Sequence, residues 1–331
     1  MDYFKEVLMK EKKQNALLRA IIVRNELGAV IPLALILIIV AFGNPKFYSV
    51  KNVLDILRTA SFSFYIGAPL TFLLTAGGMD MSIGSILSFG GVLYAKLIIS
   101  GVPVAPSILL CLIAGALIGL INGIIIVKYN QPAFIATLGT QYIISGGVLV
   151  WTGGISVSGL TAASKVIGQY YIADVFPIPI LYAIIIGVVC YVVLAKTKWG
   201  RSLAAIGGNQ ETAYLAGIPV VKRRILVYAL VGIAASFTGV IWAARFANGL
   251  PGAGDAVNMK NMAAVIIGGT SPAGGSGTII GTAFGCILLA SISNFLVFIG
   301  VPATAQQLIF GAILIAAIFI DRYRRQVLSR G

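Results

Sequence analysis

The stretch VAPSILLCLIAGALIGLINGIIIV, Val104–Val127, decides the fold class. It runs for 24 residues without a charge, and a helix of about 20 apolar residues crosses the hydrocarbon core of a membrane. The whole chain of 331 residues is 59% hydrophobic and only 10% charged, whereas a soluble domain carries about 25% charged residues. The sequence therefore predicts an all-α polytopic membrane protein.

Further apolar runs of similar length lie on both sides of this stretch. They are 27–43, 59–76, 82–100, 133–151, 178–195, 225–244 and a charge-free stretch, 261–320. The last is long enough for three crossings, broken at 272–277 and at 300–302, although 261–270 is too short to cross unless its helix begins earlier. We expect about ten transmembrane helices, with nine or eleven as alternatives, in one transmembrane domain, 27–320.

Basic residues orient the predicted spans. Of the 24 basic residues, 17 lie in the segments 1–26, 128–132, 196–224 and 321–331. Cytoplasmic segments of membrane proteins carry such an excess. The pattern predicts a cytoplasmic N-terminal segment (1–26), a cytoplasmic loop (196–224) and a cytoplasmic tail (321–331). Because the charges flank apolar runs instead of forming one basic face, membrane lipid is the expected surrounding, and nucleic acid is not expected as a partner.

Residues for catalysis, metal binding or energy conversion are not evident in the sequence. The chain contains no histidine, and Cys111, Cys190 and Cys286 lie singly inside apolar runs, so we expect no catalytic residue and no metal site. The phosphate-binding pattern G-x-x-x-x-G-K-[ST] does not occur. None of the ten acidic residues lies at the centre of a predicted span. Coupling to an ion remains an alternative because backbone carbonyls can bind sodium, but the energy is expected from a partner.

The segment 196–224 is the longest predicted cytoplasmic loop. Within it, a helix of about two turns begins after Asn209, a residue suited to cap a helix, and ends at Gly217, with Pro219 beyond it. Short helices are unstable alone in water, so this one must pack against something. It is either a connector that packs on its own bundle or an element that docks into a cytoplasmic partner.

Four blocks of this sequence resemble the ribose-type monosaccharide permeases of the branched-chain amino acid and sugar ABC permease family. They are LTAGGMDMSIGS (Leu74–Ser85), NQPAFIATLGT (Asn130–Thr140), GRSLAAIGGNQETAYLAGI (Gly200–Ile218) and AAVIIGGTSPAGGSGTIIGT (Ala263–Thr282). The third block contains the E-x-A-x-x-x-G pattern, Glu211 to Gly217, by which such permeases engage their ATPases. The chain departs from the family at Asn258 and Lys260, where members often carry an acidic pair.

The resemblance implies a type II-like ABC importer permease bundle in the bacterial cytoplasmic membrane, with both termini cytoplasmic. It implies a cytoplasmic ABC ATPase that holds ATP and magnesium, an extracytoplasmic sugar-binding protein, and a second permease copy, identical or related. The chain itself would be a transporter subunit, not an enzyme, and would hold no cofactor. The ATPase would contact Asn209, Glu211, Ala213, Tyr214, Leu215 and Gly217. The substrate would be ribose or a similar sugar, with a furanose-like signalling molecule as an alternative.

Two further sets of residues are candidates for contacts. Polar and aromatic residues that could line a sugar pathway, or form hydrogen bonds between helices, are Phe72, Asp80, Asn122, Thr137, Gln141, Asn294 and Gln306; Asp80 could also cap the helix that follows it. The long outer loop offers Lys165, Tyr170, Tyr171 and Asp174 for the binding protein. Asp55 and Arg58 are expected to form an ion pair. An ion-coupled carrier and an intramembrane enzyme are the competing functions.

Overall fold

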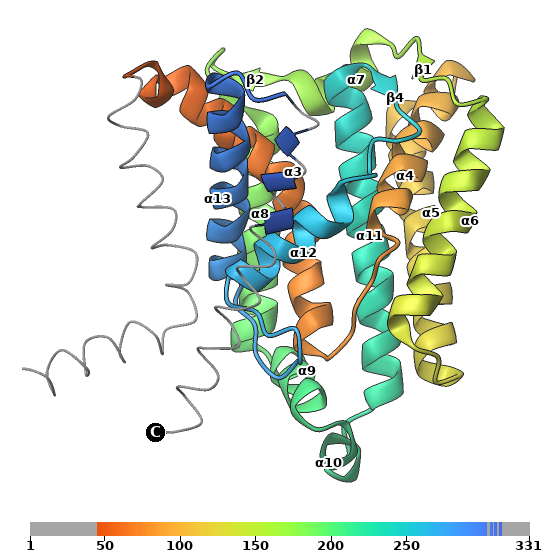
Figure 1. Cartoon of the computed structure of the whole chain (residues 1–331). Coiled ribbons are helices and arrows are strands. Elements are labelled where there is room, and N and C mark those ends of the chain that lie inside the picture. Colours follow the sequence, from red (N-terminus) through yellow and green to blue (C-terminus); the bar gives the residue numbers. More distant parts are fainter. Residues whose placement is uncertain (1–44, 303–304, 307, 310, 313–331) are drawn as a thin grey trace, which may run out of the picture.

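A bundle of long helices forms the described part of the chain, residues 45–302, 305–306, 308–309 and 311–312, in this computed structural model (Figure 1). The predicted N-terminal segment 1–26, the first predicted span 27–43 and the tail 321–331 lie outside the described residues, and 303–320 is described only in part. The described residues therefore begin just after the first predicted span.

Six described helices are long and apolar enough to cross a membrane. They are α3 (Val50–Thr75), α5 (Val104–Gly123) continued by the π-helical turn η2 (Ile124–Lys128), α6 (Ala133–Thr152), α8 (Ile178–Tyr191) continued by the π-helical turn η3 (Val192–Lys196), α11 (Val220–Phe246) and α13 (Ile279–Phe298). Each coincides with an apolar run of the sequence. The chain is therefore a multi-pass membrane protein.

The centre of the bundle is built around α3 and α11, whose Tyr65 and Tyr228 are completely buried. A ridge of glycines on α5 lies directly against α11. An added Cβ on Gly115 would meet the backbone of Gly232, and one on Gly119 would meet that of Tyr228. Close backbone approach of this kind holds helices together in lipid, where no hydrophobic force acts between them.

Two predicted crossings are shorter than full spans. The run 82–100 forms α4 (Ile83–Ile99), with 17 residues, and the run 261–270 belongs to α12 (Val257–Ile267), with 11. Irregular segments complete both passages: 76–82 rises from the lower end of α3 to the start of α4, and 250–256 descends from the upper end of the bundle to the start of α12 (Figure 1). Hydropathy marks the depth of these segments but not where helix gives way to irregular backbone. We call α4 and α12 the broken helices, because irregular backbone completes the passage of each.

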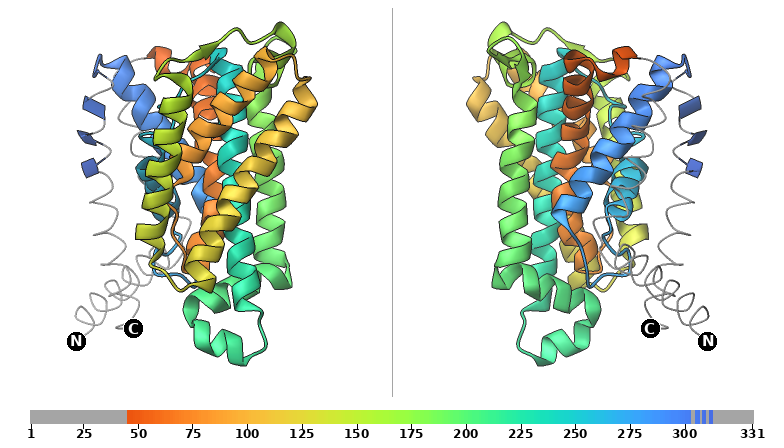
Figure 2. Two further views of the ribbon diagram at one scale, coloured as in Figure 1. Left: turned by 90° about the vertical axis from the view of Figure 1, so that its right-hand side faces the viewer. Right: turned by 90° about the vertical axis from the view of Figure 1, so that its left-hand side faces the viewer.

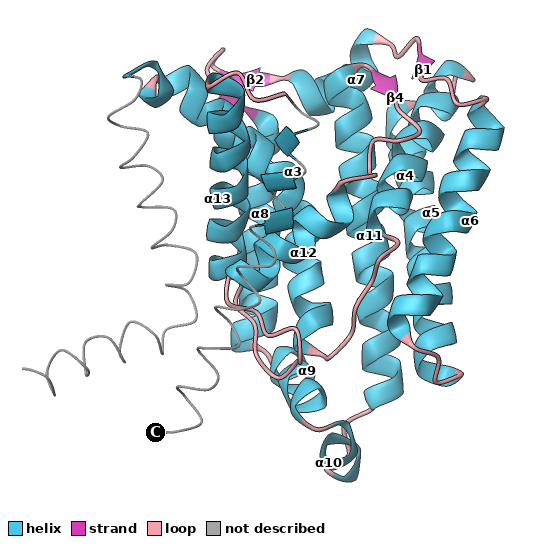
Figure 3. Cartoon of the chain, in the orientation of Figure 1, coloured by secondary structure: helices cyan, strands magenta, loops and turns pink. Residues whose placement is uncertain are grey.

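Short elements close the two ends of the bundle. The upper end carries η1 (Pro45–Tyr48), α7 (Ala162–Gln169) and two small antiparallel pairs, β1 (Val157–Ser158) with β4 (Asn248–Gly249) and β2 (Tyr171–Ile172) with β3 (Phe176–Pro177) (Figure 3). At the lower end, α9 (Lys198–Gly208) and α10 (Gln210–Leu215) extend beyond the long helices (Figure 2).

Candidate functional site

The helix α10 is a short element that is capped at both ends by its own residues. Its first turn is closed by the Asn209 side chain, which accepts a hydrogen bond from the Thr212 backbone N–H at 2.9 Å. At its end, Gly217 adopts a φ of +78°, and the Ile218 N–H donates to the Ala213 carbonyl at 3.1 Å. These are the start and stop signals expected from the sequence.

One face of α10 is held by the protein and the other is free. Ala213 is 3% exposed and packs with Ile206 and Val220. Tyr214 and Leu215 are 71% and 78% exposed, and Glu211 is also exposed. Because α10 projects beyond the spans (Figure 2), these apolar side chains are exposed outside the bundle, and exposed apolar patches mark surfaces for a partner.

The helix α9, which the sequence did not predict, supports α10. It is amphipathic and begins at a Thr197 cap, whose hydroxyl accepts from the Gly200 N–H. Two arginines tie this region to the first turn of α11. Arg223 donates to the Ser202 hydroxyl at 2.6 Å, and Arg224 donates to the Gln210 side-chain oxygen at 3.1 Å. The region α9–α10 is therefore attached to a full-length span.

A second group of polar residues lies inside the bundle, where α4 begins. Asp80 is fully buried, and one of its carboxylate oxygens accepts from both the backbone N–H and the hydroxyl of Ser82, at 2.7 and 2.6 Å. Asn122 on α5 donates to the Ser82 hydroxyl at 2.9 Å, and Thr140 on α6 donates to the Asn122 oxygen at 2.6 Å. The second Asp80 oxygen has no partner among the described residues.

Asn258, at the start of α12, joins this group from the other broken helix. Its amide nitrogen donates to the Met81 carbonyl at 2.6 Å and to the Gln141 oxygen at 3.0 Å, and its oxygen accepts from the Gly84 N–H at 2.6 Å. The Met81 N–H donates to the Thr137 hydroxyl at 2.9 Å. We call Asp80, Ser82, Asn122, Thr137, Thr140, Gln141 and Asn258 the polar network.

The polar network replaces the backbone hydrogen bonds that two broken helices lose. Irregular backbone is tolerated at membrane depth only where it is buried in protein or lines a water-filled cavity, because lipid offers no hydrogen bonds. Side chains supply partners to Met81, Ser82 and Gly84 around the start of α4, and Ser88 accepts from the Gly254 N–H at 2.9 Å. The network brings together four predicted candidates and adds Ser82, Thr140 and Asn258, the last noted before only as a departure from the family.

The other three predicted pathway residues lie apart from the polar network. Phe72 packs edge-on against Trp199 of α9, with ring centroids 5.4 Å apart. Asn294 exchanges amide hydrogen bonds with Asn52, at 2.9 and 3.1 Å. Gln306 donates to the Val301 carbonyl at 3.4 Å. The sequence shows that these residues fall in apolar runs, but not which way they face.

The upper end presents the predicted outer-loop residues differently. Tyr170 and Asp174 are exposed, and Lys165 is half-buried on α7. Tyr171 is held from below, because Arg58 donates to its hydroxyl at 2.5 Å and lies 5.1 Å from its ring. The expected pairing of Arg58 with Asp55 is wrong. Arg58 reaches across to α7 instead, where it also donates to the Gly168 carbonyl at 3.1 Å.

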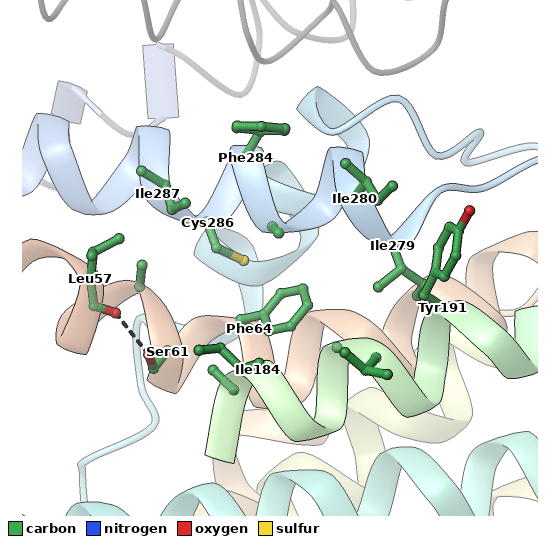
Figure 4. A pocket seen from close by; sticks show the side chains of 15 residues that line it. Leu57, Ser61, Phe64, Ile184, Tyr191, Ile279, Ile280, Phe284, Cys286 and Ile287 are labelled. Atoms are coloured by element: carbon green, nitrogen blue, oxygen red, sulfur yellow. Dashed lines mark hydrogen bonds between the residues drawn. The ribbon is translucent and has the colours of Figure 1, made fainter. Parts of the chain in front are cut away.

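An apolar groove of about 460 Å³ lies between α3, α8 and α13 (Figure 4). Its walls include Leu57, Phe64, Ile184, Ile280 and Phe284. Ser61 also lines it, but its hydroxyl already donates to the Leu57 carbonyl at 2.8 Å. A sugar requires polar partners for its hydroxyl groups, so this groove does not suit a sugar. The described residues also contain no cluster of His, Cys, Asp or Glu that could hold a metal ion.

Six apolar spans around two broken helices that a polar network joins define a polytopic membrane protein with a polar interior, as a permease requires. The chain belongs to the family described as the permease component of branched-chain amino acid transport systems, which matches residues 52–318. It is a transporter subunit and not itself an enzyme.

Individual relatives match nearly the whole chain. It is 35% identical to the ribose import permease protein RbsC of Bacillus subtilis and 32% identical to RbsC of Escherichia coli K12, in each case over 91% of this chain and 94% of the relative. It is also 32% identical to the galactose/methyl galactoside import permease protein MglC of Escherichia coli, over 91% of this chain and 96% of the relative. No solved structure matches this chain.

Proposed function

We propose that this chain is the membrane-spanning subunit of an ATP-binding-cassette importer that moves a monosaccharide into a bacterial cell. The observation that carries the proposal is α10, a self-capped helix whose Tyr214 and Leu215 are exposed beyond the bundle. The relatives named for ribose and galactose support a neutral sugar as the substrate. Ribose and galactose are different monosaccharides, so we propose a monosaccharide as the substrate class and not one particular sugar.

The lower end faces the cytoplasm in this proposal. Lys196, Lys198, Arg201 and Lys222 are exposed around α9 and α10, and such basic clusters favour the cytoplasmic side. With the segments outside the described residues, the chain has about ten transmembrane helices and both termini inside. A separate ATPase holds ATP and magnesium and binds α10, and a second permease copy completes the pathway.

The pathway runs past the polar network. Gln141 is only half-buried; its side-chain oxygen accepts from Asn258, while its amide nitrogen has no hydrogen-bond partner among the described residues. It can donate to a sugar hydroxyl without dismantling the network. In the neighbouring irregular segment 250–256, the residues Gly252 and Asp255 are exposed. Irregular backbone at membrane depth must be buried in protein or line a water-filled cavity, such as a transport pathway.

The upper end receives the binding protein. Tyr170 and Asp174 are exposed on the β2–β3 hairpin, and Arg58 fixes the neighbouring Tyr171. Lys165 lies on the adjacent α7. This arrangement offers aromatic and charged groups on a supported surface, which suits a transient protein partner.

Reconstitution tests the proposal directly. The full chain is placed in vesicles with and without its partner ATPase, and uptake of radiolabelled ribose and galactose is measured with the binding protein outside and ATP inside. We expect uptake only with the ATPase and ATP. Uptake by the chain alone, driven by a sodium or proton gradient, would show an ion-coupled carrier and would overturn the proposal.

A further inference from the structure

Three of the four sequence blocks meet at one point at the lower end of the bundle. Gly77 follows α3, Gly207 lies in the last turn of α9, and Gly274 and Gly275 lie in the segment between α12 and α13. We call these four residues the glycine junction. The blocks are far apart in the sequence, so their meeting is a feature of the fold.

Contact at the glycine junction is backbone against backbone. A Cβ on Gly207 would overlap the Thr75 carbonyl oxygen and lie 2.5 Å from the Gly275 nitrogen. A Cβ on Gly274 would lie 2.7 Å from the Gly207 carbonyl oxygen and 3.1 Å from the Gly77 Cα. The Gly275 N–H donates to the Thr75 carbonyl at 2.9 Å. Because no flexible side chain intervenes, a displacement of one segment must move the others.

Two routes lead from the glycine junction to the polar network. Gly77 lies in the segment 76–82, which carries Asp80 and Ser82 to the start of α4. The segment with Gly274 and Gly275 joins the last residue of α12 to α13, and α12 carries Asn258 at its opposite end. Both broken helices are therefore connected to the junction through a few residues of backbone.

The other side of the glycine junction leads to the exposed side chains of Tyr214 and Leu215 on α10, which we call the docking surface. Gly207 is two residues before Asn209, the cap of α10. The helices α9 and α10 are thus continuous across a single capping residue. A partner that pulls or tilts α10 moves α9 with it, and α9 is the element that the junction contacts.

We propose that the glycine junction transmits movement of α9 and α10 to the broken helices α4 and α12, so that its glycines are positioning residues for transport. This inference rests on the proposed function, because it assigns the route by which ATP hydrolysis on the partner opens the sugar pathway. Packed elements of this kind shift between discrete arrangements and do not deform continuously. Because the contact is backbone against backbone, a shift of α9 displaces the segments that Gly77, Gly274 and Gly275 belong to.

Gly207→Ala tests the proposal, with Gly208→Ala as the matched control, because a Cβ at Gly208 meets no atom within 4 Å. The ATPase, the binding protein and each full-length variant are reconstituted, and sugar transported per ATP hydrolysed is measured. We expect Gly207→Ala to keep ATP hydrolysis and to lower this ratio by about tenfold. Gly208→Ala should stay within about twofold of the parent. An unchanged ratio in Gly207→Ala would overturn the proposal.

A milder pair decides the question if Gly207→Ala does not reach the membrane. Gly275 has a φ of +82°, and its Cβ would make ordinary contact with Gly208 at 3.4 Å; Gly101 has a φ of +84° with nothing within 4 Å. Alanine at each position carries the same backbone strain. We expect about a threefold lower ratio for Gly275→Ala only. Equal ratios of sugar transported per ATP in both variants would refute the role of the glycine junction in transmitting movement. A parent protein that does not transport sugar would instead refute the proposed function itself.

Discussion

The helix α10 and the polar network satisfy their hydrogen bonds in opposite ways. The helix is closed by its neighbours in sequence, Asn209 and Gly217, and its outer face is free. The polar network depends on side chains from α5, α6 and α12, and Asn258 is 177 residues away from Met81, whose carbonyl it binds. Changes to the exposed face of α10 should therefore affect partner binding alone, whereas changes that leave backbone groups of the network without partners should affect stability and transport together.

The largest effect is expected at the docking surface. Replacing Tyr214 and Leu215 together by alanine removes two exposed apolar side chains and should weaken binding of the ATPase by about 30-fold or more. Because neither is buried, the unfolding temperature of the isolated permease should not change. Surface binding assays and thermal unfolding measure the two quantities. The control is Tyr142→Ala, which removes an exposed aromatic ring from α6. An equal loss of ATPase binding in both variants would contradict a specific binding surface on α10.

A smaller loss of transport with a loss of stability is expected in the polar network. Asn258→Leu leaves the Gly84 N–H and the Met81 carbonyl without their partner, and each buried unsatisfied group costs about 1–3 kcal/mol. Transport should fall about tenfold, and the unfolding temperature should drop. Asn294→Leu breaks a half-buried amide pair elsewhere and should lower stability while transport per folded protein stays normal. Loss of transport in both would indicate a general packing defect.

Gln141 separates the structural and transport roles of the network. Gln141→Leu removes a half-buried donor that we propose faces the pathway, while the Asn258 amide keeps its bond to Met81. We expect about a fivefold weaker apparent affinity for sugar, because one hydrogen bond contributes about 1 kcal/mol. The unfolding temperature should change little. Uptake measured over a range of binding-protein and sugar concentrations checks this, and an unchanged concentration dependence would remove Gln141 from the pathway.

The smallest effect is expected at the cap of α10. Asn209→Ala removes the acceptor for the Thr212 N–H, and loss of such a cap costs about 1 kcal/mol. The helix should fray, and ATP-driven transport should fall about threefold. Asn209→Asp restores an acceptor and should return the rate to that of the parent. If aspartate and alanine behave alike, capping is not what the asparagine contributes.

The sequence predicts local features better than features made by distant residues. The ends of α10 could be predicted from Asn209 and Gly217 because a capping residue and a terminating glycine each act within one turn of the helix. The helix α9 was missed because it contains three glycines in eleven residues and is held by packing and by Arg223. Arg58 was assigned to Asp55 by their spacing, but its partner Tyr171 is 113 residues away.

The polar network was predictable only in part. Asp80, Asn122, Thr137 and Gln141 are conspicuous as polar residues in or beside apolar runs, yet nothing in those runs shows that they meet. Phe72 and Asn294 were chosen on the same basis and lie elsewhere. Apolar runs fix the depth of a residue in the membrane, whereas its rotation around the helix is set by packing that no single segment encodes.

The shortness of α12 has a consequence for how the protein is made. Eleven residues of helix extend only about 16 Å, about half of the hydrocarbon core, so α12 cannot enter the bilayer as an independent unit while the ribosome is still translating. It lies against the backbone of Gly281 and Gly285 of α13. It must therefore wait for α13 to be inserted and then fold into place against protein that is already in the membrane, which makes the assembly of this half of the pathway a late step of biogenesis.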